Sequence, residues 1–307
     1  MIIKCDQCGT RYNLDVSSIS KPVFKVRCTN CDHRFEVHKK LDMATELLSK
    51  EKSRQTGDHT IVAVSNQKGG VAKTTSCLNL GMALSLLGRK VLLVDFDVQA
   101  NLTTSLGYPA NSLSFYDILQ SGADNISPYI RETSYDNLHL LPSNSRMALL
   151  TKHYMYKPNF EMLLKNRLQW VSDSYDYILI DTPPALGFST LNALMAADCV
   201  IIPTPCEYLS MHGIHKIEDI IKVLRNKASQ AIDYRILITM HDPTSTASKV
   251  IHRKIRNMFK ERVFETVIEL DEKMKESLIT KLPVACYDAK SKSARQYMAL
   301  AREFADL

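Results

Sequence analysis

The nine residues from Gln67 to Thr75, Q-K-G-G-V-A-K-T-T, decide the fold of most of this chain. They follow the β-branched apolar run Thr60 to Val64, which predicts a buried strand. After them Leu78, Met82 and Leu86 recur at near-helical spacing. A strand, a glycine turn and a helix N-terminus direct backbone N–H groups and the positive end of the helix dipole towards an anion. The segment therefore predicts a phosphate-binding loop.

Individual side chains of this loop suit separate roles. Lys73 is placed to reach the β- and γ-phosphates of a nucleotide, and the Thr74 hydroxyl to ligate Mg²⁺. The general pattern G-x-x-x-x-G-K-[ST] fails at both glycines, because Gln67 and Ala72 occupy those positions. Alanine is tolerated if residue 72 has a helical φ, which the first turn of the helix predicts, whereas a positive φ costs stability or affinity. The alternative is a Gly-Gly turn with unrelated lysines before a helix.

The loop resembles the deviant form K-G-G-V-G-K-T-T of the ParA/Soj/MinD family of P-loop ATPases. The resemblance implies ATP and Mg²⁺ as cofactors, a homodimer that forms on ATP binding, and slow hydrolysis that an activating protein partner stimulates. It also implies that Lys68 crosses the dimer to contact the partner's nucleotide and that Lys68 and Lys73 are catalytic. The implied nucleotide-binding residues are Lys68, Gly69, Gly70, Val71, Ala72, Lys73, Thr74 and Thr75.

Two other predicted strands end in carboxylates. The run Lys90 to Asp97 carries Asp95 and Asp97 at its end, and a second apolar run ends in Asp181 before Thr-Pro-Pro. Carboxylates at the ends of neighbouring parallel strands are suited to hold a nucleotide's metal ion and water. By resemblance, Asp181 holds Mg²⁺ opposite Thr74, Asp95 belongs to the metal and water shell, and Asp97 positions the attacking water. The alternative for the first pair is two aspartates that cap a strand.

Further apolar runs alternate with helical patterns. Strands are predicted at Asn137 to Leu141, Cys199 to Pro203 and Arg235 to Met240, with a helix over Met147 to Ser172. This alternation predicts an α/β fold with a doubly wound, mostly parallel sheet, as in P-loop NTPases, over residues 59–307. The C-terminal helix from Ala294 has little basic or aromatic character, so we expect it to pack on the sheet rather than bind a membrane.

The N-terminus contains the spacing C-x2-C-x19-C-x2-C. The cysteines are Cys5, Cys8, Cys28 and Cys31. This spacing predicts a closed zinc site with four thiolate ligands, and residues 1–38 resemble a zinc-ribbon-like domain. A redox CxxC pair is the alternative, which two matched pairs disfavour. We expect the domain to dock on a protein, while Lys21, Lys25, Arg27 and Arg34 keep nucleic-acid contact open. Residues 39–58 are polar and predict a linker.

Composition and charge narrow the class of protein. The chain has 307 residues, 45% hydrophobic and 23% charged, which is ordinary for a globular protein. No run approaches the roughly 18 apolar residues of a membrane helix, and the first residues lack the apolar core of a signal peptide. We therefore expect a cytoplasmic protein that contacts no membrane. The resemblance to the ParA/Soj/MinD family implies that it associates with the nucleoid when ATP is bound. The net charge of +6 permits an acidic partner without requiring one.

One segment is strongly basic. Lys249 to Arg262 carries six Lys or Arg and one Glu, which predicts either a solvated helix face or a nonspecific DNA-binding patch. The family often has P-R-N, with an arginine implicated in DNA contact, where this chain has Glu269-Leu270-Asp271. That contact cannot be transferred, although Lys273 and Lys275 lie nearby as substitutes.

Four functions are compatible with these motifs. The first is an ATPase whose dimerisation and hydrolysis drive segregation or positioning of DNA with a centromere-binding partner. The second uses the same cycle to position a protein cargo through an adaptor, which the zinc module and the missing arginine favour slightly. The third is a zinc-ribbon transcription regulator. The fourth is an iron–sulfur electron carrier, for which Cys77 and Cys206 are poorly placed.

Overall fold

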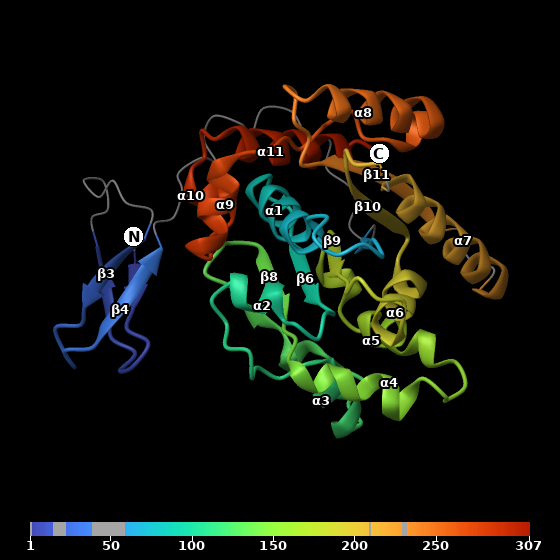
Figure 1. Ribbon diagram of the computed structural model, residues 1–307. Helices are drawn as coiled ribbons and strands as arrows, with labels where there is room; N and C mark the ends of the chain where they lie inside the picture. Colours follow the sequence, from blue (N-terminus) through green and yellow to red (C-terminus); the bar gives the residue numbers. More distant parts are fainter. Residues whose placement is uncertain (1, 15–22, 39–58, 209, 229–231) are drawn as a thin grey trace. The chain divides into compact units, whose positions relative to one another are not determined.

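The computed structural model describes residues 2–14, 23–38, 59–208, 210–228 and 232–307 (Figure 1). The chain divides into two compact units, residues 1–51 and 52–307. The linker predicted at 39–58 and Lys21 lie outside the described residues. Each unit is described by itself below.

The small unit consists of two antiparallel hairpins. Its strands are β1 (Ile2–Lys4), β2 (Arg11–Asn13), β3 (Val23–Arg27) and β4 (Arg34–His38). Strand β1 pairs with β2, and β3 with β4. Ile3, Phe35 and Val37 are buried together with Cys5 and Cys28. This core is too small to stabilise a domain without a further contribution, as expected for about 38 residues.

The large unit is built on a seven-stranded sheet in the order β11-β10-β5-β9-β6-β8-β7. The strands are β5 (Thr60–Val64), β6 (Val91–Asp95), β7 (Arg131–Glu132), β8 (Leu138–Leu141), β9 (Tyr177–Asp181), β10 (Cys199–Pro205) and β11 (Asp233–Thr239). All neighbours are parallel except β7, which pairs antiparallel with β8. The predicted doubly wound, mostly parallel sheet is therefore confirmed.

Helices lie on both faces of this sheet (Figure 1). The α-helices are α1 (Lys73–Leu86), α2 (Asn101–Ser105), α3 (Phe115–Ser121), α4 (Ala148–Tyr154), α5 (Leu163–Leu168), α6 (Phe188–Ala196), α7 (Ser210–Ala228), α8 (Thr246–Phe259), α9 (Glu272–Ile279), α10 (Val284–Tyr287) and α11 (Lys292–Ala305). The 3-10 turns are η1 (Ser127–Tyr129), η2 (Ser145–Met147), η3 (Phe160–Met162), η4 (Ser172–Ser174) and η5 (Lys260–Arg262). None of the helices in the described ranges is both long and apolar enough to cross a membrane.

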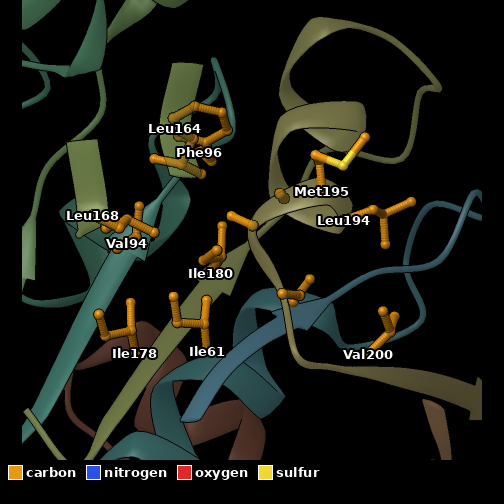
Figure 2. Packing of buried hydrophobic residues seen from close by; sticks show 14 of the residues in the cluster. Ile61, Val94, Phe96, Leu164, Leu168, Ile178, Ile180, Leu194, Met195 and Val200 are labelled. Carbon is orange, nitrogen blue, oxygen red and sulfur yellow. The ribbon is translucent and has the colours of Figure 1, made fainter. Parts of the chain in front are cut away.

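The strands alternate between two apolar cores. In β5, Ile61 and Ala63 face the core that α5, α6 and α7 cover, whereas Val62 and Val64 face the core beneath α1 and α11. Figure 2 shows the first core, where Ile61 and Ile178 from neighbouring strands lie close together. On the other face α1 packs very closely, because a Cβ on Gly81 would lie 2.6 Å from Leu93. Burial of both faces explains why these strands read as continuous apolar runs.

The single helix predicted over residues 147–172 is wrong. The structure instead has α4, a break, then η3 and α5. Pro158 lacks the N–H that a helix interior needs, and Asn159 adopts a left-handed φ of 56°. The predicted C-terminal helix is confirmed as α11, which packs on α1 through a hydrogen bond between the hydroxyls of Tyr297 and Ser76 at 3.2 Å.

Candidate functional site

The loop between β5 and α1 borders a pocket of about 490 Å³. Residues 69–75 line one side of it, and no atom lies within 4 Å of a Cβ built on Gly69 or Gly70. Gly70 has a φ of 71°, which glycine adopts without strain. The missing side chains leave open space where phosphate oxygens can approach the backbone. The loop therefore fits the triphosphate that the sequence predicts.

Ala72 differs from its sequence-based prediction. Its φ is 68° rather than helical, because it is the N-cap residue at which the loop turns into α1. A left-handed conformation costs an L-residue about 1–2 kcal/mol. The second glycine of the general motif avoids this cost, so its replacement by alanine leaves strain beside the phosphate site.

Replacing Ala72 with glycine is expected to stabilise the large unit. Relief of about 1–2 kcal/mol of strain exceeds the roughly 0.4–1 kcal/mol that glycine adds to the entropy of the unfolded chain. The net gain of about 0.5–1 kcal/mol raises the thermal midpoint by about 1–3 °C in a domain of this size. Thermal unfolding without nucleotide measures it, with Ala83→Gly as control, since glycine in the interior of α1 destabilises by about 1 kcal/mol. A thermal midpoint of Ala72→Gly below that of wild type would contradict the inference that Ala72 is strained.

Lys73 is buried at the start of α1. Its Nζ donates to the Lys68 carbonyl oxygen at 2.8 Å. Burial lowers the pKa of Lys73, and the nearby carboxylates of Asp181 and Asp97 act in the opposite direction. A cation held in this position is available to phosphate oxygens in the pocket that Lys73 lines.

The ends of β5, β6 and β9 bring the acidic residues together. Asp181 is level with Val64 in one neighbouring strand and with Asp95 in the other. Its Oδ2 accepts a hydrogen bond from Thr74 Oγ1 at 2.6 Å, and its Oδ1 is buried without a partner among the described residues. Burial, and then the charge of Asp95, raise the pKa of Asp181 well above its ordinary value. A buried, unpartnered carboxylate oxygen beside a hydroxyl fits a Mg²⁺ site, because the cation compensates the charge.

Asp95 and Asp97 differ in their surroundings. The Oδ2 of Asp95 accepts from the backbone N–H and the hydroxyl of Thr103 at 2.8 and 2.6 Å, and its Oδ1 accepts from Asp97 N at 3.2 Å. Burial raises the pKa of Asp95 to about 6, although these hydrogen bonds act to lower it. Asp97, in contrast, lines the nucleotide pocket. Asp97 therefore borders the pocket, whereas Asp95 positions the following loop through Thr103 and Asp97. The role of Asp97 in orienting water and the place of Asp95 in the metal and water shell stay predictions.

Lys68 does not line the nucleotide pocket of its own chain. Its Nζ forms an ion pair with the carboxylate of Glu207, and it borders a separate hollow of about 390 Å³. The loop is anchored by Asn66, which is 2% exposed, accepts from Lys68 N at 3.0 Å and donates to Pro203 O at 2.8 Å. Sequence reasoning missed Asn66, although its place at the junction of strand and loop is a usable signal.

The far wall of the nucleotide pocket comes from C-terminal elements. It consists of Met240, Ile268, Glu269, Leu270, Asp271, Met274, Lys275, Leu278 and Tyr297. Asp271 caps α9 by accepting from Lys273 N at 3.0 Å, and Glu269 pairs with Lys292 at 2.9 Å. The residues in place of P-R-N therefore serve the wall of this pocket. The sequence drew attention to residues 269–271 and Lys275 only in connection with DNA contact. Their place in the pocket wall could not be predicted, because it depends on how α9 and α11 pack.

The four N-terminal cysteines form a metal-binding cluster. Their Sγ atoms all lie within 4.8 Å of one another, and within the described ranges this is the one group of its kind. The Sγ atoms of Cys5 and Cys31 are 3.7 Å apart, and those of Cys8 and Cys28 3.5 Å. Tetrahedral zinc with Zn–S of about 2.3 Å requires sulfur separations of about 3.8 Å. The cluster therefore fits zinc, and it fits a closed structural site rather than a catalytic one.

Both cysteine knuckles have the same backbone geometry. Cys5 N and Cys28 N donate to Thr10 O and His33 O at 2.9 and 2.8 Å. Gly9 N and Asp32 N donate hydrogen bonds to the carbonyl oxygens of Cys5 and Cys28, each at 2.9 Å. Gly9 and Asp32 both have positive φ, 74° and 63°, which closes each turn. The repeated turn presents two thiolates to one metal ion from each side.

The other cysteines lack the surroundings of cluster ligands. Cys77 is buried in α1, and burial raises its thiol pKa well above the ordinary value. Burial also raises the pKa of Cys206, although a hydrogen bond with Ser248 acts to lower it. Within the described residues neither thiol belongs to a group of possible metal ligands, so the structure gives no support to the electron-carrier alternative.

Comparison with known proteins agrees with this geometry. An AAA-domain family model matches residues 59–236, and a zinc-ribbon model matches residues 1–36. The chain is 40% identical over 245 residues to the chromosome-partitioning ATPase Soj of Treponema pallidum, covering 80% of this chain and 96% of that protein. The chain belongs to the ParA/Soj family of P-loop ATPases.

Two further relatives of this ParA/Soj-family ATPase are informative. The sporulation initiation inhibitor protein Soj of Bacillus subtilis is 36% identical over 248 residues, covering 80% of this chain and 98% of that protein. The structure of cobyrinic acid a,c-diamide synthase from Mycobacterium smegmatis with bound ATP analogue and magnesium has 30% identity and a TM-score of 0.68, covering 80% of this chain and 93% of that chain. The cofactors of the ParA/Soj-family protein are ATP, Mg²⁺ and, in its N-terminal zinc ribbon, Zn²⁺.

Proposed function

We propose that this ATPase segregates or positions DNA by a cycle of ATP-dependent dimerisation, nonspecific DNA binding and partner-stimulated hydrolysis. The observation that supports dimerisation is the position of the Lys68 side chain, which lies outside its own nucleotide pocket and is partly exposed. A lysine in this position is available to the nucleotide of a second subunit. Names such as chromosome-partitioning ATPase Soj among its relatives support the role in DNA segregation.

The chemistry is phosphoryl transfer to water. Mg²⁺, held through Thr74 and Asp181, supplies positive charge beside the phosphate oxygens. Lys73 contacts the β- and γ-phosphates, Lys68 of a second subunit adds a further charge, and Asp97 orients the water. The groups able to accept a proton from water among the described lining residues are carboxylates, which are weak bases, so slow turnover and stimulation by a partner are expected.

The DNA-binding surface is the exposed side of α8. Of the basic residues in 249–262, Arg256 is engaged with Glu265 at 3.1 Å, and Arg262 with Asp233 at 3.1 Å. Lys249, Arg253 and Lys254 are exposed, and no ion pair holds them within the described part of the chain. We name these three residues the α8 patch. Their charges are free to contact phosphates, whereas the two arginines stabilise the fold.

Replacing the α8 patch with three alanines is expected to weaken ATP-dependent DNA binding at least tenfold. Each lost phosphate contact also removes about 0.9 from the slope of log affinity against log salt concentration. Fluorescence anisotropy with DNA of unrelated sequences, at several salt concentrations, measures both quantities. The control replaces the exposed Lys152, Lys222 and Lys290, which changes net charge equally. Equal affinity of the α8 variant and wild type would contradict the assignment.

Positioning of a protein cargo is the second candidate. Residues 1–38 carry six Lys or Arg and four Asp or Glu, and a zinc ion with four thiolates adds two negative charges, so the loaded module is neutral. Lys25 and Arg27 are also paired with Glu36 and Asp32. A neutral module favours docking on a protein over binding nucleic acid. Dimerisation with ATP but without DNA binding would select this candidate, and sequence-specific footprints without nucleotide would select a transcription regulator.

A further inference from the structure

Two hydroxyl groups of the first hairpin contact the sulfur atoms of the zinc-binding cluster. Tyr12, in β2, has its Oη 3.0 Å from Cys28 Sγ. Thr10, which precedes β2, has its Oγ1 3.1 Å from Cys8 Sγ. Cys28 is fully buried, whereas Cys8 is exposed. The hydroxyls therefore reach one protected and one accessible sulfur.

The second knuckle orients both hydroxyl protons. Asn30 Nδ2, which can only donate, donates to Thr10 Oγ1 at 3.2 Å. Thr29 Oγ1 donates to Tyr12 Oη at 3.3 Å. Each hydroxyl oxygen thus accepts one hydrogen bond, and its own proton is left to point towards sulfur. Residues 29 and 30 lie between Cys28 and Cys31, so these hydrogen bonds also tie the two knuckles together.

We propose that Thr10 and Tyr12 are positioning residues of the zinc site, which donate hydrogen bonds to the Cys8 and Cys28 thiolates. Zinc with four thiolates carries two negative charges, and part of this charge is buried with Cys5 and Cys28. Donors to charged acceptors form hydrogen bonds about twice as strong as those between neutral groups. The two hydroxyls thereby stabilise the loaded site and withdraw electron density from sulfur, which makes Cys8 a weaker nucleophile.

The test uses Tyr12→Phe and Thr10→Val in the full-length chain. Each variant is expected to bind zinc about 10-fold more weakly, because outer partners of metal ligands contribute about 10- to 100-fold to affinity. Competition with a chromophoric chelator measures this. In the cobalt-substituted protein the sulfur-to-cobalt charge-transfer band should move to lower energy, since the thiolates lose a donor. Thr10→Val should also release zinc faster to an aromatic disulfide, because Cys8 is exposed.

Two controls separate this role from packing. Thr29→Val acts only through Tyr12 and should have a smaller effect than Tyr12→Phe. Tyr156→Phe changes a tyrosine that is 93% exposed in the large unit and should leave the zinc site unchanged. Unchanged affinity, cobalt spectrum and reaction rate in both site variants would overturn the proposal. Weaker affinity with an unchanged cobalt spectrum would also overturn it, because it would show a packing role alone.

Discussion

Removal of zinc is expected to unfold residues 1–38 while the ATPase unit remains folded. The described core of the small unit has five buried residues, two of which are the metal ligands Cys5 and Cys28. Binding of structural zinc contributes about 10–16 kcal/mol in zinc-finger peptides, far more than such a core supplies. The large unit has its own sheet and two separate cores. We therefore expect its stability to be independent of the metal.

Chelation followed by two-dimensional NMR measures this result, because loss of dispersed signals can be assigned to one unit. Cys28→Ser should have the same effect without a chelator. Cys206→Ser is the matched control, since this cysteine lies outside the cluster and contacts Ser248. A small unit that keeps its dispersed signals after complete zinc removal would show that hydrophobic packing suffices. Loss of the thermal transition of the large unit would show that the two units depend on each other.

The strands and the phosphate loop could be predicted because they depend on local pattern. Strands buried on both faces require continuous apolar runs, and β5, β6 and β9 all show them. Parallel neighbours then place Asp95 and Asp181 at the same edge, as expected. The zinc cluster was predictable for a similar reason, since each CxxC closes a short local turn. In these regions the local sequence is sufficient to define the structure.

Other features depend on contacts between distant segments. The far wall of the nucleotide pocket comes from residues about 200 positions after the loop, so spacing cannot reveal it. The two hydrogen bonds that Thr103 donates to Asp95 could not be predicted, because no motif marks Thr103. Ala72 is different, because its departure from glycine was visible and the backbone angle alone was wrong. Sequence motifs therefore identify the chemical groups, whereas tertiary contacts determine which groups face the ligand.

Replacing Asp97 with alanine is expected to slow ATP hydrolysis by about 10²- to 10⁴-fold, the usual contribution of a group that assists proton transfer. Asp97 lines the pocket, its Oδ1 accepts from Gln99 N at 3.0 Å, and its Oδ2 has no hydrogen bond to a described residue. One oxygen is thus held while the other is free to orient water. MgATP should still bind, because Lys73, Thr74 and Asp181 are unchanged. Phosphate release and calorimetric titration measure the two steps separately.

Asp95→Asn is the matched control for this prediction. Both oxygens of Asp95 accept from N–H or O–H donors, so an amide NH₂ at either position faces a donor. The free energy of unfolding should fall by about 1–3 kcal/mol for the broken buried hydrogen bond. Hydrolysis per folded molecule should change less than in Asp97→Ala. The opposite ranking of the two variants would support a direct role of Asp95 in the metal and water shell.

The oligomeric state with ATP distinguishes the proposed role of Asp97 from that of Lys68. Asp97→Ala should accumulate as an ATP-bound dimer because hydrolysis no longer releases the subunits. Lys68→Ala should stay monomeric with ATP, since the variant lacks the positive charge that would contact the second subunit's nucleotide. Light scattering during gel filtration distinguishes the monomer from the dimer. Glu207→Gln tests the ion pair with Lys68, because its loss should free Lys68 and favour the dimer. If Lys68→Ala and Asp97→Ala both behave as wild type, the loop binds nucleotide without using either residue in the cycle.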